Sequence, residues 1–171
     1  MKELSPQENA FVEYLESYKK LIAKVARIYC QDSEDRKDLM QDIMLQLWKA
    51  YPRYDASYAL STWTYRVAIN VSISFLRKAG SRDKTHHAYR QQNEWFQVED
   101  PTTEERLEYL YQFIEKLKPL DKAIILLYLE GCNNKEISRV TGLSTTNVST
   151  RKQRIKEALK QYFETYQQII S

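Results

Sequence analysis

The 171-residue sequence contains few of the residue types that build catalytic or metal centres. Its two cysteines, Cys30 and Cys132, lie far apart and have no CxxC or Cys/His spacing of the kind that binds zinc. The two histidines, His86 and His87, have no third ligand or orienting carboxylate near them in the sequence. We therefore expect buried free thiols, exposed histidines and no metal site.

Long apolar segments are also missing from the sequence. No stretch is long enough to cross a bilayer, and the N-terminal residues MKELSPQENAFVEY lack the apolar core of a signal peptide. We also find no nucleophile elbow, no phosphate-binding glycine loop and no pair of catalytic carboxylates. These absences predict a cytoplasmic protein with no direct membrane insertion, no enzymatic activity, no cofactor and no small-molecule substrate.

Helical periodicity is what the sequence has in abundance, whereas strand-like alternation is absent. The three glycines, at positions 80, 131 and 142, each follow a helix-like stretch, where we expect the left-handed conformation that ends helices. We expect Ser5 to cap the first helix, with Pro6 at its first position and Glu8 completing a capping box, and Ser61 or Thr62 to cap the third. The expected helices span residues 5–29, 34–51, 61–78, 102–118, 121–130, 134–141 and 145–166.

These helices predict an all-α fold of two small domains. Residues 81–102 are polar and lack a sustained period, so we expect them to form a linker between domains at 1–80 and 103–171. On the third helix we expect a packing stripe of Val67, Val71 and Phe75. Residues 32–42 carry five acidic and two basic side chains, which favours a basic partner.

The C-terminal domain carries the strongest local pattern. Two helices joined by a short turn at Gly142 share an apolar interior formed by Ile137, Val140, Leu143, Val148 and Ile155, which predicts a helix-turn-helix. Residues 144–162 carry five basic side chains and one acidic side chain, a net charge of +4. The outward side of the second helix presents Asn147, Thr150, Arg151 and Arg154 as candidates for DNA contact. By charge alone, an ordinary solvated basic helix is the alternative interpretation.

Three stretches in this order resemble the bacterial extracytoplasmic-function sigma factors of RNA polymerase: DRKDLMQDIMLQLWKAYPRYD, LSTWTYRVAINVSISFLRK and LDKAIILLYLEGCNNKEISRVTGLSTTNVSTRKQRIKEALK. The resemblance implies two helical domains, called regions two and four, with no domain between them. It further implies promoter-specific transcription initiation, with core RNA polymerase, promoter DNA and an anti-sigma protein as partners.

The resemblance also implies site residues. An acidic helix would dock on the clamp helices of the largest polymerase subunit through Asp38, Gln41, Asp42, Leu45, Gln46 and Trp48. Residues at and after the loop 55–60 would bind the minus-ten element, namely Tyr54, Ser57, Tyr58, Trp63, Arg66, Asn70, Arg77 and Lys78. Asn70 would hold a flipped base, a tyrosine would stack on one, and the basic residues would bind phosphate. Core packing is the alternative interpretation of Trp48 and Trp63.

The family's readers of the minus-thirty-five element map to Ser149, Thr150, Gln153 and Arg154, to which we add Asn147, Arg151 and Lys156 from the helix pattern and charge. Family members often carry more arginine here, so Ser149 and Gln153 leave the preferred DNA sequence open. Two other hypotheses are a stand-alone helix-turn-helix regulator, whose first domain senses a ligand or dimerises, and, as the weakest, an enzyme with a DNA-binding tail.

Overall fold

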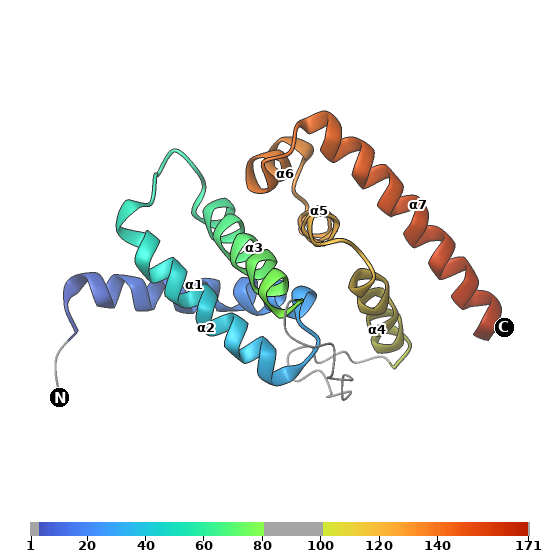
Figure 1. Cartoon of the computed structure of the whole chain (residues 1–171), viewed down its shortest axis with the longest axis horizontal. Helices are drawn as coiled ribbons and strands as arrows, with labels where there is room; N and C mark the ends of the chain where they lie inside the picture. The colour runs from blue at the N-terminus through green and yellow to red at the C-terminus, as the bar shows by residue number, and fades with distance from the viewer. Residues whose placement is uncertain (1–3, 81–100, 171) are drawn as a thin grey trace. The chain divides into compact units, whose positions relative to one another are not determined.

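The computed structural model describes residues 4–80 and 101–170, with side chains for 4–80 and 103–168 (Figure 1). The chain divides into two compact units, residues 1–89 and 90–171. The described residues form α-helices, one short 3-10 turn and no strand, which confirms the predicted all-α fold of two small domains. The predicted linker lies outside the described residues, together with His86 and His87, except that its last two residues already belong to a helix.

The first unit is built from three helices and the turn between the second and third. They are α1 (Pro6–Tyr29), α2 (Ser33–Ala50), the 3-10 turn η1 (Tyr51–Arg53) and α3 (Leu60–Ala79). The capping box predicted for α1 is confirmed: the backbone N–H of Ser5 donates to Glu8 Oε2 at 2.6 Å, and that of Glu8 donates to Ser5 Oγ at 3.3 Å. The backbone N–H of Ser5, and after it the Ser5 hydroxyl, hold the pKa of the Glu8 carboxyl below its usual value.

The core of the first unit lies where α3 packs against α1 and α2, and Figure 1 shows α2 and α3 running side by side. The stripe of Leu39, Ile43 and Leu47 on α2 is fully buried. On α3, the small residues Ala68 and Ser72 are fully buried. Small side chains at buried positions let the backbones of packed helices approach closely.

Two predictions for α3 are wrong. Its N-cap is Ala59, with no side-chain cap bond, so the helix begins before the Ser61 or Thr62 expected to cap it. Its buried face is formed by Thr64, Tyr65, Ala68, Ile69 and Ser72, whereas the expected stripe of Val67, Val71 and Phe75 is only half-buried. Burial of the two hydroxyl residues is possible because the Oγ1 of Thr64 and the Oγ of Ser72 donate to carbonyls one turn back in the same helix.

The second unit contains α4 (Pro101–Glu115), α5 (Pro119–Leu129), α6 (Asn134–Thr141) and α7 (Thr145–Ile170). Gly131 and Gly142 take the predicted left-handed conformation, with φ of 82° and 75°. Gly80, at the end of α3, does not: its φ is −65°, and its N–H continues the helical pattern by bonding to the Leu76 carbonyl. The glycine at position 80 therefore marks the end of the helix in the sequence, but it does not predict the backbone conformation of that residue.

The apolar interior predicted for the helix-turn-helix is present. Ile137, Val140, Val148 and Ile155 are buried against α5, and Leu143 is half-buried. The far end of α7 is held to α4 by aromatic rings: Tyr109 lies 4.3 Å from Tyr162 and 4.2 Å from Tyr166, measured between ring centroids. None of the described helices is long and apolar enough to cross a bilayer.

Candidate nucleic-acid interface

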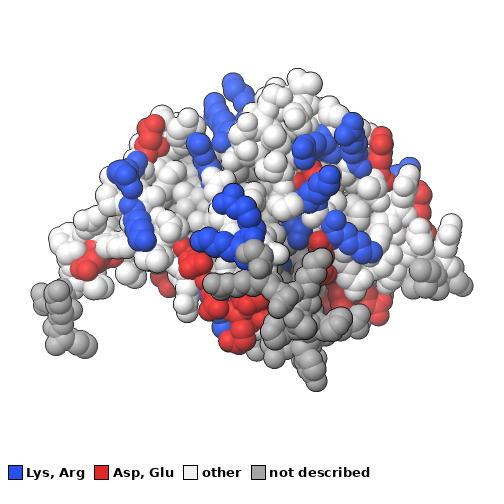
Figure 2. Space-filling view, in the orientation of Figure 1, with Lys and Arg blue, Asp and Glu red and all other residues white. Residues whose placement is uncertain are grey.

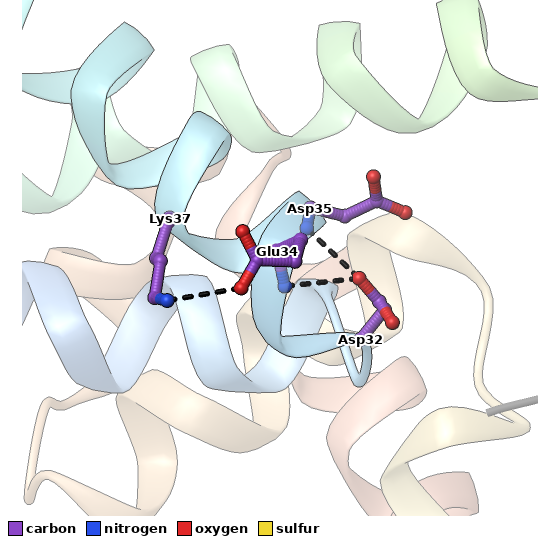
Figure 3. A network of polar contacts seen from close by, with 4 residues as sticks. All are labelled: Asp32, Glu34, Asp35 and Lys37. Atoms are coloured by element: carbon purple, nitrogen blue, oxygen red, sulfur yellow. Dashed lines mark hydrogen bonds and ion pairs between the residues drawn. The ribbon is translucent and has the colours of Figure 1, made fainter. Parts of the chain in front are cut away.

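The start of α2 is acidic, and much of that charge stabilises the helix itself (Figure 3). The Oδ1 of Asp32 accepts the backbone N–H groups of Glu34 and Asp35 at 3.0 and 2.9 Å. Glu34 also forms an exposed ion pair with Lys37 at 2.9 Å. The Asp32 carboxylate therefore pairs with two N–H groups that the helix itself leaves without an acceptor, and it lies at the positive end of the helix, which accounts for the start of α2.

The next turns of α2 form a surface that folding does not use, which we call the α2 face. Its members lie on one side of the helix and are exposed: Asp38, Gln41, Asp42, Leu45 and Gln46. The carboxylates and amides of this face form no hydrogen bond or ion pair with another described residue. Leu45, 48% exposed, adds apolar area beside them. A solvent-facing leucine among unpaired acids and amides suits a contact with a partner that is both basic and apolar.

Trp48 is the remaining residue predicted for this face. Its position agrees in part with a role in core packing and in part with a role in partner contact. Its ring meets that of Phe11 edge-on at 4.9 Å between centroids, so it packs against the core. It is nevertheless only half-buried, and its exposed part continues the α2 face at the position three residues after Leu45.

The loop between η1 and α3 is held by its own polar groups. The backbone N–H of Ser57 donates to Asp55 Oδ1 at 2.9 Å, and the Ser57 hydroxyl donates to Asp55 Oδ2 at 2.7 Å. These bonds lower the pKa of the Asp55 carboxyl. The hydroxyl of Tyr54 donates to the carbonyl of Tyr58. Ser57 and Tyr54 therefore form hydrogen bonds within the loop, whereas Tyr58 is 39% exposed as a residue and can offer its ring for stacking.

An exposed polar side of α3 continues from this loop. Arg66, Asn70 and Arg77 are exposed, and their spacing of four and eleven residues places them within about 40° of each other around the helix. The Asn70 amide forms no side-chain hydrogen bond with a described residue, so its donors and acceptor are free. Lys78 is exposed but lies about 120° away from Arg66 by the same count.

An aromatic cluster under the loop was not predicted from the sequence. Tyr51 lies 5.3 Å from Phe11, 5.1 Å from Tyr14 and 6.5 Å from Trp63 between ring centroids, and Trp63 lies 5.3 Å from Tyr54. Trp63 thus packs under the loop, the alternative left open for it. The recurrence of aromatics at three- and four-residue intervals from position 11 is the signal that could have indicated this cluster.

The cluster is tied to α3 by a buried hydrogen bond between Tyr14 Oη and Thr64 Oγ1, of 2.7 Å. Because Thr64 Oγ1 already donates to the Leu60 carbonyl at 2.7 Å, it is Tyr14 that donates in this pair. Burial raises the pKa of Tyr14 to about 12. The loop and the start of α3 are therefore supported by packed rings with a fully paired polar contact.

In the second unit, α7 begins beside a groove of about 610 Å³. Ser144 caps the helix by accepting the backbone N–H of Asn147 at 3.1 Å. Figure 2 shows Lys and Arg side chains on the visible face of this unit, as on that of the first unit. The groove is lined by Lys118, Asp121, Ser144, Thr146, Asn147, Thr150, Arg151, Arg154 and Ile155. Four of the predicted DNA-contacting residues therefore lie together along one groove: Asn147, Thr150, Arg151 and Arg154.

The basic residues of α7 differ in how far folding already engages them. Arg151 donates through Nη1 to Asp121 Oδ1 and through Nε to Asn147 Oδ1, both at 2.9 Å. Lys156 lies over the Tyr128 ring, 5.4 Å from its centroid. Arg154 is exposed and forms no hydrogen bond or ion pair with a described residue.

The predicted polar readers are also unequal. Gln153 donates from Nε2 to Glu157 at 3.0 Å, whereas Ser149 is exposed without a side-chain hydrogen bond to the described part of the chain. Asp121 and Tyr128, which hold Arg151 and Lys156, were not predicted. In the sequence, Asp121 is an ordinary acidic residue in the first turn of a helix that starts with proline. No local pattern therefore indicated its contact with Arg151.

The described residues contain no cluster of three or more metal-ligating side chains. Cys30 and Cys132 are both free thiols. Cys30 is buried as expected, but Cys132, the residue after the left-handed Gly131, is only half-buried. Partial burial raises the pKa of the Cys132 thiol, as do nearby Glu136 and Glu130.

Two family models match the chain, and each falls on one unit. Residues 14–82 match Sigma-70 region 2, and residues 107–159 match Sigma-70 region 4. The chain is 25% identical over 154 residues to the ECF RNA polymerase sigma factor SigM of Mycobacterium tuberculosis, covering 88% of this chain and 75% of that protein. It is 25% identical over 164 residues to the ECF RNA polymerase sigma-E factor of Escherichia coli, covering 89% and 85%.

Solved structures show the same fold. The sigma factor RpoE in complex with the anti-sigma factor NepR from Bartonella quintana superposes with a TM-score of 0.72 at 17% identity, covering 91% of this chain and 97% of that one. CnrH in complex with the cytosolic domain of CnrY superposes with a TM-score of 0.66 at 20% identity, covering 92% and 89%.

Proposed function

Since the chain belongs to the sigma-70 family, as a sigma factor of the extracytoplasmic-function type, we propose that it binds core RNA polymerase and directs promoter-specific transcription initiation. It would read the minus-thirty-five and minus-ten elements and help to open the duplex. The observation that carries this proposal is that one chain contains both sigma units, and that each presents exposed polar side chains of which some, such as Asn70 and Arg154, form no hydrogen bond or ion pair with a described residue. As a transcription factor of this family, it would act in the cytoplasm without catalytic activity of its own.

The α2 face is the proposed site for the polymerase clamp helices. Its unpaired acids, Asp38 and Asp42, would meet basic side chains, and Leu45 with the exposed part of Trp48 would supply apolar contact. Exposed charges of this kind steer association and set specificity, while apolar anchors contribute more of the affinity. Asp32 is excluded from this role because its carboxylate caps the helix, and Glu34 because it pairs with Lys37.

The loop after η1 and the outer side of α3 are the proposed reader of the minus-ten element. Asn70 has a free amide, which can both donate to and accept from the Watson–Crick edge of a flipped base. The exposed Tyr58 ring offers a stacking surface, and Arg66 and Arg77 on the same side would bind phosphate. The packed aromatic cluster beneath would keep this constellation rigid while the duplex opens.

The groove side of α7 is the proposed reader of the minus-thirty-five element. Its N-terminal turns carry Asn147, Thr150 and Arg154, in the place where a helix-turn-helix presents side chains to the major groove. Arg154 is free and can form a bidentate contact to guanine. We expect an anti-sigma protein to regulate the chain, in keeping with the RpoE–NepR complex to which it is similar.

Run-off transcription with core polymerase on a randomised promoter library tests this function. We expect transcripts to start downstream of paired upstream and minus-ten elements only when both the chain and core polymerase are present. The matched comparison is DNA binding by the chain alone. Promoter-specific binding at full strength without polymerase, with no stimulated transcription, would instead identify a stand-alone helix-turn-helix regulator.

A further inference from the structure

Asp121 lies outside the reading helix, yet it lines the groove beside it. It stands in the first turn of α5, and its Oδ1 accepts from Arg151 Nη1 at 2.9 Å. The side chains of this pair are only 32% and 21% exposed, for Arg151 and Asp121 respectively. A partly buried pair between two helices keeps its geometry better than the exposed pairs along one helix.

The pair extends to Asn147, one turn earlier on α7. Arg151 Nε donates to Asn147 Oδ1 at 2.9 Å, so the guanidinium bridges the carboxylate and the amide. The amide orientation follows from this bond, because a flipped amide would set two donors against each other. Asn147 therefore turns its carbonyl oxygen toward Arg151 and leaves both hydrogens of its NH2 group free for another acceptor.

We propose that Asp121 is a positioning residue for promoter recognition, which acts by holding Arg151 so that Asn147 presents its NH2 donors to the DNA. This inference rests on the proposed function of α7. A free asparagine amide can pair with adenine through one donor and one acceptor, whereas a held amide of this kind favours base atoms that accept. The same ion pair keeps the charge of Arg151 from binding phosphate indiscriminately.

The decisive variant is Asp121→Asn, which keeps the shape of the side chain and removes its charge. Binding of the holoenzyme to upstream-element variants would be measured at several salt concentrations. Loss of one well-placed contact changes base discrimination by about fivefold or more. We expect a loss of this size at the base pair facing Asn147, together with a steeper salt dependence of about one unit, because Arg151 is released to bind phosphate.

The control is Glu115→Gln, which neutralises an exposed carboxylate at the end of α4 that forms no hydrogen bond or ion pair with a described residue and does not line the groove. It should leave both the discrimination and the salt slope unchanged. Adding Arg151→Met to Asp121→Asn should abolish the increase in salt slope. If Asp121→Asn instead behaves like the control, the positioning role is wrong. If the Asp121→Asn chain does not fold, Asp121→Glu serves: it should change discrimination at that base pair but not the slope.

A DNA-free measurement separates failure of this inference from failure of the proposed function. In the free chain, the NMR signal of Arg151 Nε–H should shift and exchange faster with water in Asp121→Asn, but not in Glu115→Gln. An unchanged signal would overturn the inference even for a chain that initiates transcription normally. A shifted signal in a chain whose parent shows no promoter preference would uphold the contact and refute the function of α7, and with it the role of Asp121.

Discussion

The buried hydroxyl pair under the minus-ten loop gives a prediction with a defined direction. Tyr14 is 5% exposed and Thr64 is fully buried. Tyr14→Phe removes one donor, but Thr64 keeps its own bond to the Leu60 carbonyl, so we expect a loss of about 0.5–1.5 kcal/mol in the free energy of unfolding. Thr64→Val leaves the buried Tyr14 hydroxyl without its acceptor, at a cost of about 1–3 kcal/mol.

Urea denaturation followed by tryptophan fluorescence would measure this difference. A Trp95→Phe background leaves Trp48 and Trp63 as reporters, and both lie in the first unit. Thr64→Val should have the lower midpoint, with an unchanged slope. A lower midpoint for Tyr14→Phe would show that Thr64, not Tyr14, donates in the pair and would refute the assignment.

The same burial predicts a dependence on alkaline pH. The pKa of Tyr14 is raised from 10.0 to about 12 on folding, so the unfolded chain releases this proton first. Its contribution to stability is complete below pH 10 and is lost as the pH rises through 12. Tyr14→Phe should therefore lose less stability than the parent between these values, and parallel losses would contradict the assigned shift.

Four further variants test the proposed contacts with polymerase and DNA. Reversing the charge of Asp38 and Asp42 should weaken association with core polymerase about tenfold or more in a competition assay, with unchanged helical circular dichroism, because like charges would then face each other. Asn70→Ala should flatten preference at one minus-ten position more than it weakens general binding, and a uniform loss would indicate a structural role. Arg154→Ala should remove about 1–3 kcal/mol of discrimination in the upstream element. Lys160→Ala should weaken all sequences alike and lower the salt slope by about one unit, and a changed sequence preference would contradict this.

Helix existence and most helix ends could be predicted because their signals are local. The capping box at Ser5 and the left-handed Gly142 depend on residues within one turn of each other. The start of α3 could not be predicted in this way. Ser61 and Thr62 have the chemistry of caps, yet the helix begins earlier, where Trp63 packs against Tyr54 and Tyr14. Tertiary packing of one aromatic ring thus outweighed the local capping preference.

The buried face of α3 shows a second limit. Hydrophobicity favours a stripe through Val67 and Phe75, but close packing against α1 and α2 selects the small residues Ala68 and Ser72. The polarity of Ser72 is no obstacle once its hydroxyl bonds within the helix. Which face of α3 is buried therefore depends on how closely the neighbouring helices approach it. The sequence of a single helix does not specify that distance.

The basic residues of α7 show that charge and helical periodicity predict where a candidate site lies. They do not predict which side chains of that site are free to bind a ligand. Arg151 and Arg154 lie three residues apart and line one groove, so the sequence predicts the same role, DNA contact, for both. The structure separates them, because Arg151 is already neutralised by Asp121 while Arg154 is free. Lys156 is likewise partly engaged, by Tyr128. Since salt dependence counts only cations that replace counterions on phosphate, this helix should show a smaller slope than its number of basic residues implies.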